Sequence, residues 1–317
     1  MKLKTNYEEI VNVANIATEG NAGHVGEVLT LAGQEKLRPA VRDGKRVLLI
    51  AIDMQNDFME GIGSLPVPGS KGDVERLTRF IYGNMEGITD IMCSIDTHYP
   101  QQIFHPAMWA DKDGNQPDPY TMITYEAVAN GEWTVAVGLP KKALECLKAL
   151  EQAGKVGVLV WPYHCLIGTN GGALEAEFAK IVHFHALARK SKPQFVFKGT
   201  DVYSEMYGII EPEYNPEGFV NFQVLNAIAG DNADGQFEIH YDEIYLAGEA
   251  ASHCLLESGA QILKRFANHP EVTQRITILE DCTSPVTGFE QQAKDAFDDF
   301  KKQYGIQVKK STEVQLV

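Results

Sequence analysis

The chain has 317 residues, of which 44% are hydrophobic, and this is enough to bury the core of one large domain or two small ones. The formal net charge of −15 argues against nucleic acid and anionic membrane surfaces as partners, because both require basic patches. No stretch approaches the roughly twenty apolar residues of a membrane span, and the N-terminus lacks a signal-peptide core. We therefore expect a soluble, cytoplasmic protein.

The five cysteines are odd in number and form no C-x-x-C pair. This pattern indicates neither a disulfide framework nor a thiolate zinc site. Reduced thiols fit the cytoplasm and suit a nucleophilic cysteine.

Residues 1–45 precede the first strand pattern and contain two short helical patterns, Tyr7 to Ala17 and Val25 to Leu37. A segment of this length is too short to bury a core of its own. We therefore expect an N-terminal extension that packs on the body formed by residues 46–317.

From residue 46 onward, apolar runs rich in β-branched residues alternate with helical patterns. This alternation is typical of βαβ units and predicts a three-layer α/β/α, Rossmann-like fold with a mostly parallel six-stranded sheet. The predicted strands are 47–52, 91–95, 156–160, 195–198, 244–247 and 276–279, and the predicted helices are 73–86, 141–153, 172–189, 253–267 and 288–303.

Two long segments fall outside this alternation. Residues 106–135 carry several prolines and two tryptophans, and residues 203–235 are rich in Tyr, Pro, Gly and Asn. Segments of about thirty residues are too long to be plain connections. We interpret 106–135 as an insertion, and both segments as a cover over the site or as contacts between the subunits of a homo-oligomer.

An acid, a lysine and a cysteine each follow or close a separate strand pattern. Asp53 ends the first apolar run, Lys198 ends the run at 195–198, and Cys254 follows the run at 244–247. Each has an ordinary explanation as a cap, an exposed strand end or a core residue. In a parallel sheet, however, the carboxyl ends lie on one edge, where open α/β sheets place their chemistry. Cys254 would also begin a helix, a position that favours a thiolate.

A second group combines a carboxylate with imidazoles. In Asp96-x-His98 the two side chains lie on one face of an extended segment, and His164 follows another strand pattern. Such a set suits zinc, iron or manganese. The alternative for any one histidine is a hydrogen-bonded structural role, and this is our interpretation of the six histidines at 24, 183, 185, 240, 253 and 269.

Several motifs occur together in the order seen in nicotinamidases. The chain therefore resembles the metal-binding nicotinamidase branch of the isochorismatase-like superfamily of cysteine hydrolases. The resemblance runs from about Arg46 to Glu280, with an insertion in the middle. The segments that carry it are Ile52–Phe58, Asp96–His98, Trp161–Cys165, Phe197–Gly199 and Gly248–Cys254.

The resemblance implies an amidohydrolase that acts on nicotinamide or a similar small amide and yields the carboxylic acid and ammonia through a thioester. It implies that Cys254 is the nucleophile, that Asp53 is the base and that Lys198 positions and charges the cluster. It further implies an oxyanion hole made by the amides of Ala250 and Cys254, with a cis peptide bond between Glu249 and Ala250.

The resemblance also implies one divalent metal ion, with zinc expected first and iron or manganese as alternatives. The implied ligands are Asp96, His98 and His164, with His105 or water completing the shell. Phe58 and Trp161 match the aromatic walls that hold the substrate ring, and their alternative is ordinary core packing.

The sequence departs from the family pattern after Lys198-Gly199, where Glu205 and Met206 fall near the pocket in place of a serine and an aromatic residue. This departure leaves the exact substrate open. One competing interpretation is a metal-free hydrolase of the isochorismatase or carbamoyl-amide type, against which the Asp96-x-His98 motif counts. Another is a non-catalytic regulatory member of the family, against which the intact set of acid, lysine and cysteine counts.

Overall fold

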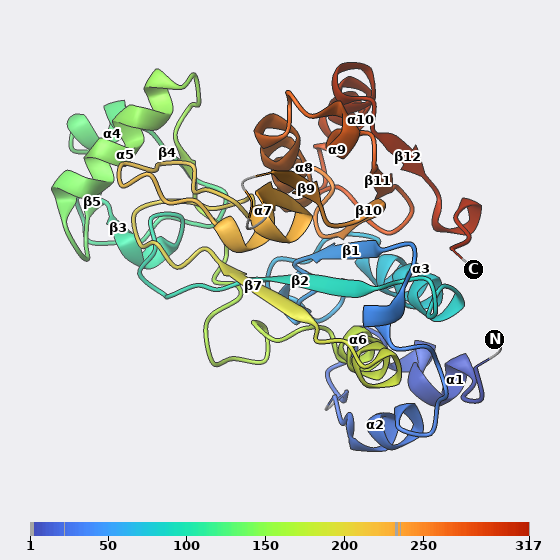
Figure 1. Ribbon diagram of the computed structural model, residues 1–317. Coiled ribbons are helices and arrows are strands. Elements are labelled where there is room, and N and C mark those ends of the chain that lie inside the picture. Colours follow the sequence, from blue (N-terminus) through green and yellow to red (C-terminus); the bar gives the residue numbers. More distant parts are fainter. Residues whose placement is uncertain (1–2, 22, 232–233, 235, 317) are drawn as a thin grey trace.

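The computed structural model describes residues 3–21, 23–231, 234 and 236–316. Its centre is a six-stranded sheet in the order β12-β11-β10-β1-β2-β7, and every pairing within it is parallel (Figure 1). The expected α/β fold with a mostly parallel six-stranded sheet is confirmed. The strands are β1 (Val47–Ile52), β2 (Asp90–Asp96), β7 (Gln194–Lys198), β10 (Glu243–Gly248), β11 (Ile276–Leu279) and β12 (Gln307–Lys309).

The strand order reverses between β1 and β10. The chain runs outward through β1, β2 and β7, then returns to β10 and runs outward on the other side. Such a reversal opens a crevice at the carboxyl ends of the two central strands. At that end Ile52 pairs with Gly248, whose φ is +111°. A Cβ at Gly248 would collide with the backbone of Ile52, so the approach of the two strands requires glycine there.

Helices cover both faces of the sheet. Because side chains alternate along a strand, Leu49 and Ala51 of β1 enter one core, while Leu48 and Ile50 enter the other. The first core is closed by α3 (Ser70–Gly83) and α6 (Ala176–Arg189), and the second by α7 (Phe222–Ile228), α8 (Cys254–Arg265), α9 (Pro270–Thr273) and α10 (Glu290–Tyr304).

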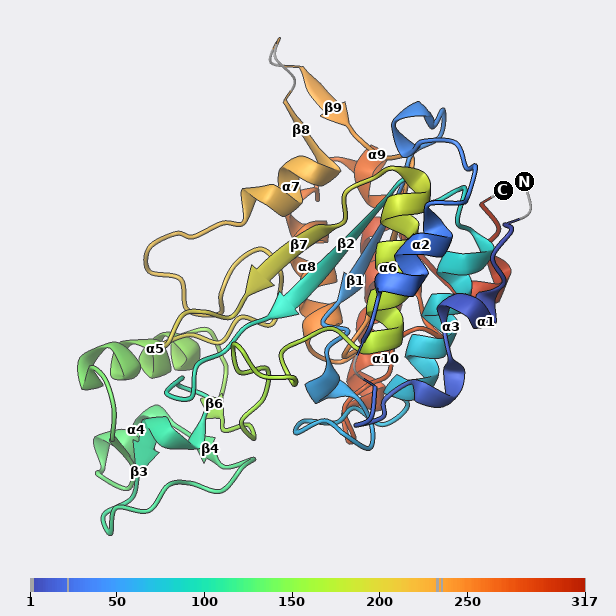
Figure 2. The same ribbon diagram turned by 90° about the horizontal axis from the view of Figure 1, so that it is seen from below.

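The described part of residues 1–45 lies against the α3 and α6 layer (Figure 2). Its helices are α1 (Tyr7–Ile10) and α2 (Gly26–Ala32). Acidic groups at the start of α6 hold the segment, since Glu175 accepts a hydrogen bond from the amide of Ala17 and Glu177 accepts one from the amide of Asn12. The segment thus adds an outer layer to one face of the body.

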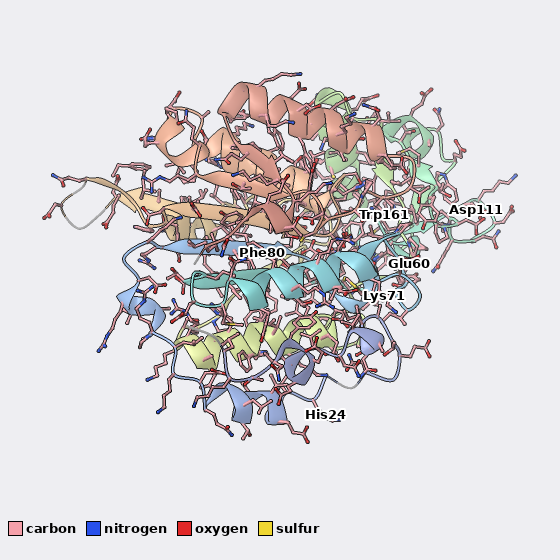
Figure 3. The ribbon with its side chains drawn as sticks, turned by 90° about the vertical axis from the view of Figure 1, so that its right-hand side faces the viewer. His24, Glu60, Lys71, Phe80, Asp111 and Trp161 are labelled. Carbon is pink, nitrogen blue, oxygen red and sulfur yellow. The ribbon has the colours of Figure 1, made fainter. Side chains whose placement is uncertain are left out.

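A lobe projects from the body between β2 and α6. We define the lobe as residues 103–161, which share a core of their own. Figure 3 places Trp161 where the lobe meets the body and Asp111 on the outer part of the lobe. The elements of the lobe are β3 (Trp109–Ala110), β4 (Met122–Ile123), α4 (Tyr125–Ala129), β5 (Thr134–Val135), α5 (Pro140–Gln152) and β6 (Val158–Leu159).

One of the six predicted strands of the sheet is wrong. The run 156–160 contains β6, which pairs antiparallel with β4 in the lobe, and the sixth strand of the sheet is β12. The run is apolar because the core of the lobe buries it, and a short apolar run does not reveal which core it enters. β12 lies at the sheet edge and is only partly buried, so it carries no apolar run that predicts a strand. The predicted helix 141–153 likewise corresponds to α5, which packs in the lobe.

The segment 203–235 contains more than loops. After an irregular stretch it forms α7, and then β8 (Ala229–Asp231) pairs with β9 (Phe237–Ile239) in a short hairpin. Within the described residues, no helix combines the length and the apolar character needed to cross a lipid bilayer. Short 3₁₀ helices occur at Val13–Asn15, Ala40–Arg42, Asn56–Phe58, Pro106–Met108 and Ser311–Glu313.

A buried ion pair joins α6 to the segment that leads into β1. Arg189 is fully buried and lies 2.5 Å from the equally buried carboxylate of Asp43. We predict that Arg189→Met lowers the free energy of unfolding by roughly 3 kcal/mol, because it leaves the Asp43 carboxylate without its buried cation. Chemical denaturation monitored by circular dichroism measures this. The control Lys302→Met removes an exposed ion pair with Asp299 and should change stability by less than about 1 kcal/mol. Equal effects of the two substitutions would contradict the prediction.

Candidate active site

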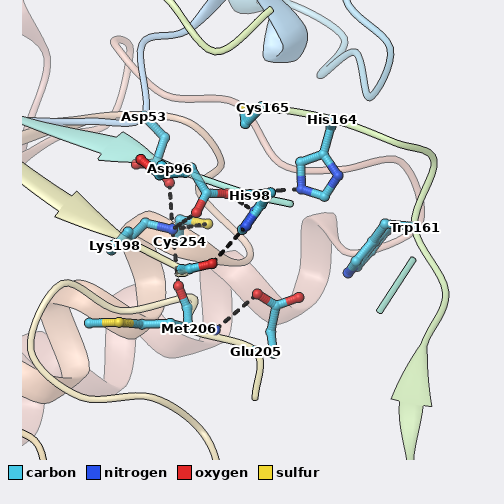
Figure 4. A network of polar contacts seen from close by, with 12 residues as sticks. Asp53, Asp96, His98, Trp161, His164, Cys165, Lys198, Glu205, Met206 and Cys254 are labelled. Atoms are coloured by element: carbon cyan, nitrogen blue, oxygen red, sulfur yellow. Dashed lines mark hydrogen bonds and ion pairs between the residues drawn. The ribbon is translucent and has the colours of Figure 1, made fainter. Parts of the chain in front are cut away.

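The acid, the lysine and the cysteine expected at strand ends meet in one place. Asp53 follows β1, Lys198 is the last residue of β7, and Cys254 begins α8 after β10. The Nζ atom of Lys198 lies 3.0 Å from Oδ2 of Asp53 and 3.7 Å from Sγ of Cys254 (Figure 4). All three residues are buried. Because β2 separates β7 from β1, only a long side chain can reach from β7 to this point.

Asp53 is held by its backbone and by one neighbour. Its φ is +46°, in the left-handed region that aspartate tolerates better than most residues. Its amide donates to Oγ of Ser94 at 2.9 Å, and the Ser94 hydroxyl donates to Oδ1 at 2.5 Å. Oδ2 contacts the Lys198 ammonium and accepts no other N–H or O–H hydrogen bond that the described chain shows. Burial raises the pKa of Asp53, with Lys198 opposing this effect, and the carboxylate is therefore a competent proton acceptor at Oδ2.

Lys198 is a buried cation between two carboxylates. Besides Asp53, its Nζ contacts Oδ1 of Asp96 at 2.9 Å and donates to the carbonyl of Met206 at 3.0 Å. Burial alone would lower the pKa of Lys198, but Asp53 and Asp96 outweigh burial and hold it well above its usual range. The ammonium is therefore charged and can stabilise a negative sulfur beside it.

Cys254 is placed for attack but is protonated at rest. Burial raises the pKa of its thiol well above the usual range, although Lys198 acts in the opposite direction. The thiol therefore needs a base to become a nucleophile. Asp53 contacts the same Lys198 ammonium as the sulfur, and a hydrogen bond with the Asp53 side chain is among the causes of the raised pKa of the Cys254 thiol, so Asp53 is the carboxylate within reach of the thiol proton.

Two backbone amides beside the thiol lack acceptors. Within the described chain, the N–H groups of Ala250 and Cys254 donate to no carbonyl or side chain, whereas the neighbouring amides of Glu249 and Ala251 bond to Ile52 and Ser284. The Glu249–Ala250 peptide bond is cis, as the resemblance implies. Free, mostly buried amides near a nucleophile are suited to hold an oxyanion.

The predicted metal ligands Asp96, His98 and His164 also lie together. Their candidate ligand atoms are all within 4.8 Å of one another, and all three residues are buried. Nε2 of His98 lies 2.8 Å from Oδ2 of Asp96, and Nε2 of His164 lies 3.9 Å from the same atom. Lys198 contacts the other oxygen of Asp96, so the two clusters share one carboxylate.

The chemistry of this donor set fits a divalent ion. Nδ1 of His98 lies 3.0 Å from the carbonyl oxygen of Gly199, and Nδ1 of His164 lies 2.8 Å from that of Pro162. A carbonyl only accepts, so each Nδ1 carries the proton, and the lone pair of a neutral ring is left on Nε2, which faces Asp96. Carbonyls behind the histidines in this way are typical of metal sites. Burial also lowers the pKa of His164 well below its usual value, which keeps that ring neutral.

His105 is next to this cluster without joining it. Its Nδ1 lies 2.9 Å from the carbonyl of Tyr99, but its Nε2 lies 3.4 Å from Nδ1 of His164, on the side of that ring away from Asp96. Burial and the nearby His98 lower the pKa of His105 to about 4, so its ring is neutral. A role for His105 as fourth ligand therefore requires its ring to turn.

A glycine makes room for the cluster. Gly199 has a φ of +78°, and a Cβ at this position would lie 2.6 Å from Cε1 of His98 and 2.7 Å from Oδ1 of Asp96. Any side chain would displace these two groups. The glycine directly after Lys198 therefore serves the geometry of the cluster as well as the turn.

A pocket leads from the surface to the thiol. Both predicted aromatic walls, Phe58 and Trp161, line it together with Cys254. Other lining residues were not assigned from the sequence, namely Leu65, Val67, Glu205, Tyr207, His253 and Val286. The departure after Lys198-Gly199 indicated the region of Glu205, but no spacing pattern indicated His253, whose position depends on the start of α8.

Residues after β1 tie the two clusters to the sheet. The side-chain amide of Gln55 accepts a hydrogen bond from the amide of Asp96 at 2.7 Å and donates to its carbonyl at 2.8 Å. Oδ2 of Asp57 accepts from the amide of Cys165 at 2.7 Å, next to His164. The turn after β1 therefore positions both predicted ligand segments. Ser94, which orients Asp53, gave no signal in the sequence because it lies inside a buried strand pattern.

Known proteins resemble the chain in sequence and in fold. No family model matches it. It is 24% identical over 246 residues to the nicotinamidase of Saccharomyces cerevisiae, a match that covers 75% of this chain and 88% of that protein. The structure of the yeast nicotinamidase bound to the inhibitor nicotinaldehyde matches with a TM-score of 0.54 at 20% identity, covering 83% of this chain and 99% of the other. An Acinetobacter baumanii nicotinamidase and pyrazinamidase matches with a TM-score of 0.55 at 14% identity, covering 86% and 100%. The chain thus has the nicotinamidase fold, and the resemblance found in its motifs is confirmed.

A buried pair of carboxyl groups lies behind the free amide of Ala250. Glu249 and Asp73 of α3 are both fully buried, and the Asp73 carboxyl group is the side-chain hydrogen-bond partner of the Glu249 carboxyl group. Arg76 contacts Oδ1 of Asp73 at 2.7 Å. Burial, and then Asp73, raise the pKa of Glu249 well above 4.5, so its carboxyl group keeps a proton in the folded protein.

This pair predicts a pH-dependent stability. Above the usual pKa of Glu249, the unfolded chain releases a proton that the folded chain retains, so stability falls as pH rises. Glu249→Gln keeps the shape of the side chain and a hydrogen-bond donor but has no titratable group. We therefore expect the free energy of unfolding of this variant, relative to that of wild type, to increase between pH 5 and 8 by at most about 1.4 kcal/mol per pH unit. Denaturation at several pH values measures this. The exposed control Glu132→Gln should show no such trend, and a constant difference for Glu249→Gln would refute the prediction.

Proposed function

We propose that this chain is a cysteine-dependent, metal-assisted amidohydrolase that converts nicotinamide or a similar small amide into the carboxylic acid and ammonia. The observation that carries the proposal is the meeting of Asp53, Lys198 and Cys254 at the carboxyl end of the sheet, beside the cluster of Asp96, His98 and His164. The similarity to the yeast nicotinamidase supports the substrate class.

The first half of the reaction makes a thioester. Oδ2 of Asp53 takes the proton of the Cys254 thiol, and the sulfur attacks the amide carbon of the substrate. Lys198 remains charged beside the sulfur and compensates the negative charge during the transfer. The carbonyl oxygen becomes an oxyanion within reach of the free amides of Ala250 and Cys254. The carbon–nitrogen bond then breaks, Asp53 gives the proton that it took from the thiol to the leaving nitrogen, and ammonia leaves.

The second half releases the acid. Asp53, again a carboxylate, takes a proton from a water molecule that attacks the thioester carbon. The same two amides hold the second oxyanion. The carbon–sulfur bond breaks, and the proton on Asp53 returns to the sulfur of Cys254, so that the enzyme regains its resting state.

Asp96, His98 and His164 would hold the divalent ion through one carboxylate oxygen and two Nε2 atoms. When bound, such an ion orients a ligand and polarises polar groups as a Lewis acid. Phe58 and Trp161 line the same pocket and supply apolar contact surface for a planar ring. The aromatic side chains would therefore hold the substrate ring, and the ion would orient its edge, so that the amide is directed at Cys254.

The nucleophile assignment predicts the loss of amide hydrolysis in Cys254→Ala with retention of the fold, because no thioester can form. Asp53→Asn should lose nearly as much activity, on the order of 1,000-fold or more, since the residues act as a unit. Ammonia release from nicotinamide and related amides measures both effects, and circular dichroism verifies the fold. The control Cys146→Ala removes a thiol of the lobe and should leave turnover unchanged. Turnover retained in Cys254→Ala would instead indicate a hydrolase that needs no cysteine nucleophile.

The metal assignment predicts that His98→Ala lowers the content of divalent metal and weakens substrate binding, because one ligand is lost. Elemental analysis and calorimetric titration with substrate measure the two effects. His183→Ala serves as the control, since this histidine lies on α6 beside Phe195 and outside the cluster. His105→Ala shows whether the fourth position is occupied by His105 or by water. A native protein that is active without metal, with unchanged turnover in His98→Ala, would favour the metal-free type of hydrolase.

A further inference from the structure

One buried acid of the pocket has no part in the mechanism above. Glu205 lines the pocket together with Cys254, Trp161 and Tyr207, and its residue surface is only 9% exposed. It does not belong to the set of clustered ligand atoms formed by Asp96, His98 and His164. Figure 4 shows its carboxylate between the chain at Met206 and the ring of Trp161.

The position of this carboxylate is fixed from both sides. Oε1 accepts a hydrogen bond from the amide of Met206 at 2.9 Å, and the carbonyl of Met206 accepts one from Lys198 at 3.0 Å. On the far side, Nε1 of Trp161 donates to the hydroxyl of Tyr207 at 3.2 Å. Hydrogen bonds therefore hold the segment 204–207 to Lys198 and to the lobe, and Glu205 belongs to an ordered wall of the pocket.

One oxygen of Glu205 has no partner. Oε2 makes no hydrogen bond within the described chain, and the nearby basic side chains are already engaged, Lys198 by its two carboxylates and His98 by Asp96. Much of the remaining lining is apolar, including Phe58, Leu65, Val67 and Val286. A carboxylate oxygen that faces a mostly apolar pocket can accept a hydrogen bond from a donor on a ligand, and a ligand without such a donor would leave that oxygen unpaired.

On the basis of the proposed amidohydrolase function, we propose that Glu205 determines specificity by accepting a hydrogen bond from the acyl part of the substrate. The pocket then selects small aromatic carboxamides that carry an amino or other N–H substituent on the ring. Trp161 and Tyr207 line the pocket together with the carboxylate, and aromatic walls suit an aromatic acyl group. Burial raises the pKa of Glu205 to about 7, and a donor or cationic ligand would favour its ionised, accepting form.

The test compares amides that differ only in this donor. Pairs of pyridine carboxamides that carry either an amino or a methyl group at the same ring position serve as probes, and kcat/KM is measured for each. For at least one position, we expect wild type to prefer the amino compound by about tenfold or more. Glu205→Met should reduce this ratio to about one, and Glu205→Gln should give an intermediate ratio. The control Glu211→Gln lies on the same segment, is paired with Arg265 and should keep the wild-type ratio.

Binding measurements separate this proposal from the proposed function. In the Cys254→Ala background, calorimetric titration with the same pairs gives a Kd ratio that needs no turnover, and it should show the same dependence on Glu205. If no amide releases ammonia but this binding preference is found, the hydrolase assignment fails and the role of Glu205 stands. If hydrolysis occurs without an amino preference at any position, or with one that persists in Glu205→Met, the role of Glu205 is refuted. Loss of metal from both Glu205 variants would also refute it, because Glu205 would then be a metal ligand.

Discussion

The contact of the Lys198 ammonium with the carboxylates of Asp53 and Asp96 is the interaction on which the site depends. Two buried carboxylates so close together would repel each other and lose their hydration without a cation between them. The same ammonium lies beside the sulfur of Cys254 and holds the carbonyl of Met206. It thereby joins the nucleophile, the base, the candidate metal cluster and one pocket wall into a single charged network.

The sheet topology supplies the geometry that this network needs. Asp53 and Cys254 come from β1 and β10, which are adjacent where the strand order reverses. Asp96 comes from β2 and Lys198 from β7, so the four residues close four neighbouring strands. Backbone positions at the ends of packed strands move little, and the site is therefore ordered before any ligand binds. Specificity comes instead from connecting segments, since the lobe contributes Trp161 and the segment after β7 contributes Glu205.

The sequence by itself determined the elements whose signals are local. The runs that form β1, β2, β7, β10 and β11 were found because they are rich in apolar residues, and the polar residues that close them were then visible as exceptions. Asp96-x-His98 was also a local signal, because two candidate metal ligands separated by one residue lie on the same face of an extended segment. These local signals, with the motif resemblance, were enough to predict the class of fold and to propose which side chains meet.

Only the tertiary structure decided the features that depend on approach between distant segments. The run at 156–160 entered the core of the lobe instead of the sheet, and β12 closed the sheet edge without an apolar run. Ser94 of β2 orients Asp53, which follows the neighbouring strand β1. The ring of His105 faces the side of His164 that is turned away from Asp96, where the two rings cannot share an ion. The surroundings of Glu205 are likewise made by neighbours that come from several other segments. Such relations carry no periodicity along the chain, because packing in three dimensions creates them.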